Sequence, residues 1–168
     1  IVQIKTTDTS GGPNNGGVTT TYANADGASA IRGLEWQGRW GFAGNFKLTF
    51  GGTRYFHDRD LVNGSRVDVN NVPRVAAKVA LDADIGPWTG RLGLRYRGPI
   101  KDQDWVTGGG RQVQQGGFSV VDLNVRYRID KAQSVALSVE NLGDRFYTEK
   151  FGYNMSGRNM RSNYRYEF

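Results

Sequence analysis

Apolar and polar side chains alternate along most of this chain. Between residues 75 and 85 the odd positions are Val, Ala, Val, Leu, Ala and Ile, while the even positions include Lys78, Asp82 and Asp84. An extended strand sends successive side chains to opposite faces, so this segment has one apolar and one mostly polar face. The same period recurs in residues 88–97, 121–129, 134–140 and 159–168, and more loosely in 2–5, 34–40 and 45–57. No comparable helical period occurs, so the pattern predicts an all-β chain of about eight antiparallel strands.

The predicted connections alternate between short and long. The short ones are residues 41–44, 85–87 and 130–131, and the long ones are 8–20, 58–71, 98–117 and 141–157. The long connections are rich in Gly, Asn and Asp, which tolerate turn conformations. Tight turns at one end of a sheet and long loops at the other are typical of outer-membrane barrels. The connections therefore predict an antiparallel transmembrane β-barrel segment.

Composition removes several other classes of protein. Aromatic residues make up 12 % of the 168 residues, which is too many for a disordered chain. No apolar run approaches the roughly 18 residues of a membrane helix, whereas barrel strands escape that criterion because their hydropathy averages out. The chain has no cysteine, so it has neither disulfides nor a thiolate metal site. Its net charge is +6, but no run of five basic residues concentrates that charge.

A soluble antiparallel sandwich would show the same alternation. Two features favour the barrel. The apolar faces carry aromatic residues near strand ends, as a membrane girdle does, namely Trp36, Trp40, Trp88, Tyr96 and Tyr127. The polar faces carry many arginines, as a wet lumen would. A β-module that binds nucleic acid would need aromatic and basic residues on one face, but here they mostly fall on opposite faces, so no nucleic-acid partner is expected.

Several segments match, in order along the chain, the motifs of one family of membrane barrels. Residues 22–35 are similar to a strand opening in these barrels, and residues 72–74 look like the start of a descending strand. Residues 139–147 are similar to the family's x-x-N-L-F-D-K-x-Y segment, and residues 153–158 resemble the Y-x-x-x-G-R motif that opens its last strand. The chain then closes with Tyr164, Tyr166 and Phe168, which resemble the family's terminal assembly signal. Taken together, these segments resemble the barrel of TonB-dependent outer-membrane receptors. Gly143 and Asn163 depart from the family pattern, which usually has Phe and Gly there.

The resemblance implies a role for the chain in a larger protein. Family barrels have twenty-two strands around an N-terminal plug, and residues 1–168 would supply about the last eight strands, with the plug absent from this chain. The implied function is energy-coupled uptake of a scarce nutrient complex, with a ferric siderophore first and haem or a corrinoid next. The implied partners are the TonB complex through the missing plug, the metal chelate, membrane lipid with lipopolysaccharide, and the barrel-assembly machinery. The implied location is the outer membrane of a Gram-negative bacterium.

A complete small eight-stranded barrel with a structural or adhesive role is the alternative. Its lumen would have room only for its own side chains, and an arginine-biased inner face packs poorly in so narrow a space. Whether the sheet closes within this chain distinguishes the small barrel from part of a larger one. In a small barrel residues 1–7 pair with residues 158–168, because an open edge in lipid is prohibitive. In a larger barrel both edges stay bare within this chain, which is the arrangement we expect.

No catalytic constellation occurs, so the chain is not predicted to be an enzyme. His57 lies in a His-Asp-Xaa-Asp sequence, but one His with two flexible carboxylates defines no geometry, and neither a metal site nor a cofactor is predicted. Basic residues near the loop side of the lumen and aromatic residues of the loops are the candidates for substrate contact. They are Tyr55, His57, Arg95, Arg97, Trp105, Arg111 and Tyr153.

Overall fold

The computed structural model describes residues 2–7, 18–23, 30–62, 65–104, 106–107 and 111–168. The chain divides into two compact units, Ile1–Ala30 with Arg59–Asp68, and Ile31–Asp58 with Val69–Phe168. In the first unit, β1 (Val2–Thr7) pairs with β2 (Val18–Ala23), and β5 (Ser65–Asp68) pairs with the last residues of β4 (Phe46–Val62). The part of the chain described here contains no helix long and apolar enough to cross a bilayer.

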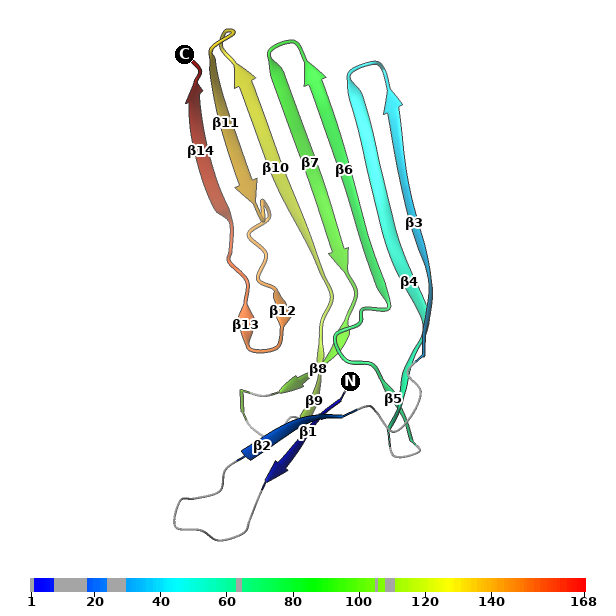
Figure 1. Ribbon diagram of the computed structural model, residues 1–168. Coiled ribbons are helices and arrows are strands. Elements are labelled where there is room, and N and C mark those ends of the chain that lie inside the picture. Colours follow the sequence, from blue (N-terminus) through cyan, green and yellow to red (C-terminus); the bar gives the residue numbers. More distant parts are fainter. Residues whose placement is uncertain (1, 8–17, 24–29, 63–64, 105, 108–110) are drawn as a thin grey trace, which may run out of the picture. The chain divides into compact units, whose positions relative to one another are not determined.

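The second unit is built on one large antiparallel sheet (Figure 1). Its strand order is β14-β11-β10-β7-β6-β4-β3. The strands are β3 (Ala30–Phe42), β4, β6 (Val75–Ile85), β7 (Trp88–Arg97), β10 (Phe118–Arg128), β11 (Gln133–Glu140) and β14 (Asn159–Tyr166). Strands that follow one another along the chain are neighbours in space, apart from short hairpins in the long connections. The all-β antiparallel fold predicted from the alternation is therefore confirmed.

Tight turns join these strands at one end of the sheet, where the C-terminus also lies (Figure 1). The β6–β7 turn is Gly86-Pro87, with Gly86 at a φ of 58° that favours glycine. The β10–β11 turn is closed by Asp130, whose carboxylate accepts the amides of Ala132 and Gln133 at 2.8 Å each. All three predicted short connections are confirmed as turns, although residues 41 and 42 belong to β3.

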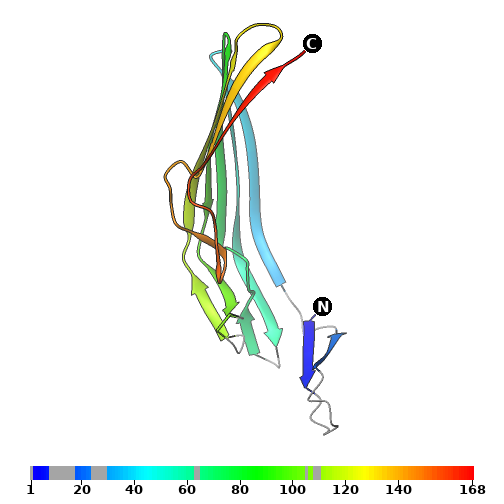
Figure 2. The ribbon, with the colours of Figure 1, turned by 90° about the vertical axis from the view of Figure 1, so that its left-hand side faces the viewer.

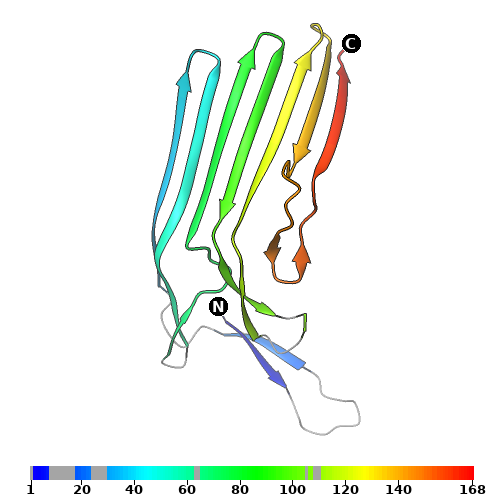
Figure 3. The same cartoon turned by 180° about the vertical axis from the view of Figure 1, so that it is seen from behind.

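The sheet has one apolar face and one polar face, because the register lines up residues of one parity across the strands. One apolar row runs Phe50, Val79, Leu94 and Val121, and the next runs Leu48, Leu81, Leu92 and Leu123. Figures 1 and 3 view the two faces, and within the second unit no other sheet of the described residues is packed on the apolar face. Leu92 is 45 % exposed and Leu94 42 % exposed. Alternation along the strands predicts that the apolar side chains of a membrane sheet are exposed. Five such side chains are exposed and three are half-buried: Val79, Leu92, Leu94, Leu137 and Tyr164 are exposed, and Val75, Val121 and Val125 are half-buried.

Aromatic residues form two rows across the apolar face. Near the turns, the register brings Ile85, Trp88, Tyr127, Val135 and Tyr164 into line. The rings of Trp88 and Tyr127 lie 4.6 Å apart. Near the long connections, Tyr96 lies in line with Ala77 and Gly52, and the ring of Trp36 lies over Gly52. Two aromatic rows that flank an apolar band are the arrangement of a membrane-spanning sheet.

The long connections carry more strand than the sequence pattern predicts. Residues 98–117 contain the hairpin β8 (Ile100–Asp104) and β9 (Arg111–Gln115), and residues 141–157 contain β12 (Thr148–Lys150) and β13 (Tyr153–Asn154). Residues 58–71 contain the end of β4 and all of β5. These hairpins are short and mostly polar, for example Ile-Lys-Asp-Gln-Asp in β8, so the apolar alternation does not reveal them.

The large sheet is open within this chain. Among the described strands β14 pairs only with β11, and β1 pairs only with β2. Figure 2 shows the sheet from its edge as a curved surface. The expectation of an open sheet with bare edges is confirmed, but one edge was assigned wrongly. That edge is β3 rather than residues 1–7, because the first strand forms a hairpin with β2 instead.

Gly52 should be sensitive to substitution because an aromatic ring lies over it. A Cβ at position 52 would lie 2.5 Å from Trp36 Cζ2 and 2.7 Å from the Ala76 carbonyl oxygen. Gly52→Ala should therefore lower the free energy of unfolding by about 1–3 kcal/mol, measured by urea titration of the refolded barrel. Gly93→Ala is the matched control, since a Cβ there meets nothing within 4 Å. Equal stability of the two variants would contradict the packing described.

Candidate functional site

The segment between β11 and β14 lies against the polar face of the sheet. We call residues 141–157 the docked segment. Its Tyr147 is buried and lies 4.5 Å, ring to ring, from Phe118 of β10. Phe118 is 5 % exposed and Val120 2 %, although both share the parity of the polar residue Asp122. Met155 packs against the same cluster. The docked segment thus covers Phe118 and Val120, the two apolar residues that interrupt the polar face.

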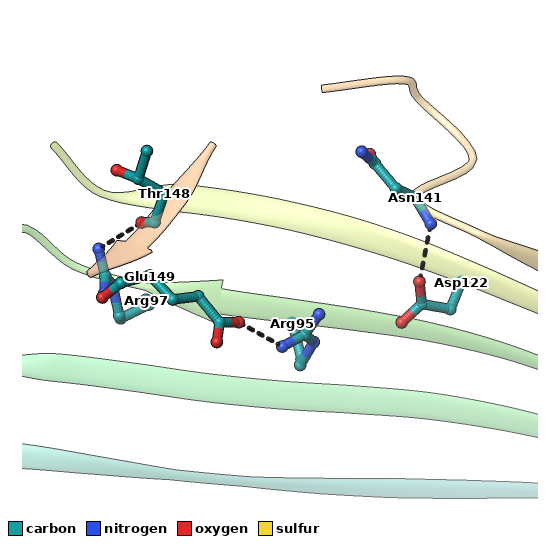
Figure 4. A network of polar contacts seen from close by, with 6 residues as sticks. All are labelled: Arg95, Arg97, Asp122, Asn141, Thr148 and Glu149. Atoms are coloured by element: carbon teal, nitrogen blue, oxygen red, sulfur yellow. Dashed lines mark hydrogen bonds and ion pairs between the residues drawn. The ribbon is translucent and has the colours of Figure 1, made fainter. Parts of the chain in front are cut away.

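Two arginines of β7 hold the docked segment (Figure 4). Arg97 donates from Nη1 to the Glu149 carbonyl oxygen at 2.7 Å and from Nη2 to the Thr148 carbonyl oxygen at 3.1 Å. Its guanidinium also lies 4.7 Å from the centre of the Phe118 ring. Arg95 makes an ion pair with the Glu149 carboxylate at 3.2 Å. A planar guanidinium can donate two parallel bonds in this way, so Arg97 fixes the position of the β12 backbone.

Asp102 joins the docked segment to the hairpin of β8 and β9. It is only 2 % exposed, and its carboxylate accepts the Phe151 amide at 2.8 Å and the Gln115 side-chain amide at 2.7 Å. The Thr148 hydroxyl donates to the side-chain oxygen of Gln115 at 3.1 Å. Burial opposes ionisation of Asp102, but amide hydrogen bonds from Phe151 and Gln103 outweigh it and lower the pKa of this carboxyl.

Asn141 sets the direction in which the docked segment leaves β11. Its φ is 52°, a left-handed conformation that Asn tolerates better than most residues. Its backbone amide donates to the Asp122 carboxylate at 2.9 Å (Figure 4). Its side-chain amide donates to the carbonyl oxygens of Arg145 and Ser156, and its side-chain oxygen accepts the Arg145 amide at 2.9 Å. This buried side chain therefore ties both ends of the docked segment together.

A cavity of about 530 Å³ lies between the docked segment and the sheet. Its charged lining consists of Arg95 and the carboxylates of Asp122, Glu140 and Glu149. The carboxylates outnumber the arginine, so this cavity suits a cationic group better than an anionic chelate. Within the described residues, no cluster of three His, Cys, Asp or Glu side chains could hold a metal ion.

The predicted site residues do not gather at one place. Arg95 and Arg97 hold the docked segment, and Tyr55 lies half-buried beside Gly33 on the polar face. Arg111 is exposed at the start of β9, and Tyr153 is 63 % exposed in β13. The side chain of His57, and Trp105 altogether, lie outside the described residues. At the C-terminus Tyr164, Tyr166 and Phe168 are all exposed, and the rings of the last two lie 4.9 Å apart.

Sequence reasoning missed Asp102, Gln115 and Tyr147, which carry much of this network. One feature of the sequence does indicate that a segment packs on the polar face. Phe118 and Val120 are apolar residues on a polar parity, which indicates that something covers them. The role of Asp102 was not readable, because its partner Phe151 lies 49 residues away in the chain.

The lowered pKa of Asp102 gives the docked segment a pH dependence. A carboxyl with a depressed pKa stabilises the docked state fully above its ordinary value of 3.8, and that stabilisation is lost as pH falls through the lower folded value. A nitroxide attached through Tyr153→Cys should therefore stay immobile at neutral pH and gain mobility only below about pH 3.8, by electron paramagnetic resonance. Adding Asp102→Asn should abolish this transition. A transition that survives Asp102→Asn would contradict the assignment, and a label at Lys131→Cys serves as the control.

Comparisons with known proteins place these features in a family. Residues 2–142 match the family described as TonB dependent receptor-like, beta-barrel. The chain is 28 % identical over 141 residues to the pesticin receptor of Yersinia pestis, covering 79 % of this chain and 20 % of that protein. It therefore spans about a fifth of the length of the curated relatives it matches.

Solved structures share the fold at low sequence identity. The siderophore receptor PirA from Acinetobacter baumannii aligns with a TM-score of 0.69 and 20 % identity, over 100 % of this chain and 26 % of that one. The ferripyoverdine receptor of the outer membrane of Pseudomonas aeruginosa aligns with a TM-score of 0.69 and 18 % identity, over 98 % of this chain and 23 % of that one. The large sheet thus corresponds to part of a much longer receptor barrel.

Proposed function

Because the chain belongs to the TonB-dependent receptor β-barrel family, we propose that it forms part of the wall of an outer-membrane transporter that takes up a ferric siderophore. This family consists of transport receptors, and no enzymatic activity is proposed. The observation that carries the proposal is the division of the sheet into an exposed apolar face and a polar face that bears the docked segment. The first face suits lipid, and the second suits the lumen of a wide barrel.

The docked segment shapes the lumen of this transporter. Arg95 and Arg97 are positioning residues, because their guanidinium groups are engaged by the docked segment. Arg111 and Tyr153 are exposed and are the substrate contacts we propose among the described side chains, with Tyr55 deeper on the same face as Arg95. His57 and Trp105 stay in the proposal from the sequence alone. Basic and aromatic side chains among the loops suit an anionic chelate with aromatic groups.

The remaining partners follow from the proposed transporter. Energy reaches the transporter through a plug domain that contacts the TonB complex. The barrel-assembly machinery of a Gram-negative outer membrane recognises β14 and the end of the chain, at Tyr164, Tyr166 and Phe168. Haem or a corrinoid is the second class of substrate, taken up by the same route.

Binding of defined chelates to the whole purified receptor tests the substrate class. The probes are a ferric catecholate, a ferric hydroxamate, haem and cobalamin, followed by quenching of tryptophan fluorescence. We expect one ferric chelate to bind, and Arg111→Gln with Tyr153→Ala to weaken it about tenfold or more. Arg128→Gln with Tyr127→Ala is the control at the other end of the sheet. Binding of haem or cobalamin alone would overturn the siderophore assignment, and binding of none of the four would overturn the transport proposal.

A further inference from the structure

Met155 is one of two methionines among the 168 residues, and the chain has no cysteine. Without thiols, the thioether is the side chain of this protein that peroxides oxidise most readily. The other methionine, Met160, lies on β14 in the apolar row of Leu123 and Val139. Met155 lies in the docked segment on the polar face, so the two thioethers have different surroundings.

The Met155 side chain packs where the docked segment meets the sheet. It lies against the apolar cluster of Phe118, Val120 and Tyr147, and its backbone amide donates to the Tyr147 carbonyl oxygen at 3.0 Å. This cluster is an apolar contact on a face whose other side chains are mostly polar. A loss of packing at Met155 therefore weakens the attachment of the docked segment.

The same side chain is within reach of small polar molecules. Met155 is half-buried and lines the cavity of about 530 Å³ between the docked segment and the sheet. One water molecule needs only about 10–15 Å³ of cavity, and hydrogen peroxide is little larger than water. Glu140, Ser156 and Gly157 also line this cavity and are exposed, so the cavity is open to solvent. Hydrogen peroxide can thus reach the thioether while the segment stays docked.

Oxidation of Met155 by hydrogen peroxide is a two-electron step. The sulfur attacks one peroxide oxygen, and an S–O bond forms as the O–O bond breaks. The leaving oxygen takes up the proton of the transferred oxygen and departs as water. The sulfur is oxidised and the peroxide is reduced, so no further reactant is needed. The product is methionine sulfoxide, a polar side chain that packs poorly against apolar neighbours such as Phe118 and Val120.

We propose that Met155 is a peroxide-sensitive modification site whose oxidation releases the docked segment from the polar face. The docked segment includes Tyr153 of β13, one of the substrate contacts proposed above. Release therefore also weakens binding of the chelate. This second effect rests on the proposed function, whereas release of the segment does not.

Peptide mass mapping and proteolysis of the whole purified receptor test the inference. After brief exposure to hydrogen peroxide, we expect Met155 to gain one oxygen about threefold or more faster than Met160, which lies on the apolar face. Tryptic cleavage after Lys150 of β12 should then accelerate about tenfold, because its rate follows the released population. Treatment with the methionine sulfoxide reductases MsrA and MsrB should restore slow cleavage.

Two variants assign the effect to one residue. Met155→Leu keeps an apolar side chain of similar volume, so it should remain docked and should abolish the acceleration by peroxide. Met160→Leu is the matched control and should leave the acceleration in place. A heat-modifiable band on electrophoresis confirms that each variant is folded.

Three results would overturn the inference. They are oxidation of Met155 no faster than that of Met160, a cleavage rate that stays within twofold once Met155 is oxidised, or equal acceleration in Met155→Leu. Chelate binding, followed by fluorescence quenching, separates the two proposals. Faster cleavage with chelate binding unchanged would refute the link to the substrate and retain the release. A receptor that binds no chelate before oxidation would refute only the proposed function.

Discussion

Replacing Asn141 by alanine is expected to release the docked segment. The substitution removes three side-chain hydrogen bonds, to the carbonyl oxygens of Arg145 and Ser156 and from the Arg145 amide. At about 1 kcal/mol for each, docking weakens by about 3 kcal/mol, and the released fraction rises about a hundredfold. The φ of 52° adds to this cost, because alanine tolerates it less well.

The measurement is the rate of tryptic cleavage after Lys150, which lies in β12 of the docked segment. Cleavage requires the strand to open, so its rate follows the released population. Asn141→Asp keeps the oxygen that accepts the Arg145 amide and should give an intermediate rate. Asn159→Ala makes the same chemical change on exposed β14 and should leave the rate unchanged. An unchanged rate in Asn141→Ala would show that other contacts suffice to hold the segment.

Replacing Arg97 by alanine is expected to loosen the same segment from its other side. The substitution removes two charge-assisted bonds to backbone carbonyl oxygens and the contact with the Phe118 ring. Hydrogen bonds to a charged group contribute about 1.5–3 kcal/mol each, so we expect amide hydrogen exchange in residues 148–151 to accelerate by tenfold or more. Arg97→Lys keeps the positive charge but lacks the two parallel N–H donors of a guanidinium. It should therefore restore little of the protection of these amides against exchange.

Arg91→Ala is the matched control for Arg97. Arg91 lies on the same strand and pairs with Asp82 at 3.1 Å, with its side chain about half exposed. Such a surface pair contributes at most about 1 kcal/mol, and it does not touch the docked segment. Equal exchange in the two variants would mean that loss of positive charge from the lumen, and not loss of the two parallel donors, loosens the segment.

The alternation of side chains predicts strands and faces but not what covers a face. The odd residues of 75–85 predict the apolar face directly, since the period of two follows from the geometry of a strand. The pairing of residues 1–7 was predicted wrongly, because a strand of six residues specifies its partner only weakly.

The sequence pattern did not predict that residues 141–157 pack against the sheet. The family resemblance marked residues 139–147 without giving their role. That role depends on Asn141 and on contacts of β7 with β12, which lie some fifty residues apart in the chain. Long-range hydrogen bonds of this kind leave no periodic signal. Phe118 and Val120 were the local sign, since they place apolar side chains where Asp122 and Asn124 continue the polar parity.

The central claim is that one face of the sheet lies against lipid and the other against water. The chain contains no cysteine, so a single cysteine introduced into it reports one position. Adjacent residues Arg91 and Leu92 lie on opposite faces of β7. In the whole receptor in vesicles, Arg91→Cys should react with a water-soluble maleimide, and Leu92→Cys should not. In a separate preparation, a nitroxide is attached to Leu92→Cys before the receptor is placed in vesicles. This nitroxide should be relaxed by oxygen rather than by a nickel chelate. Reaction of both cysteines, or of Leu92→Cys alone, would contradict the claim.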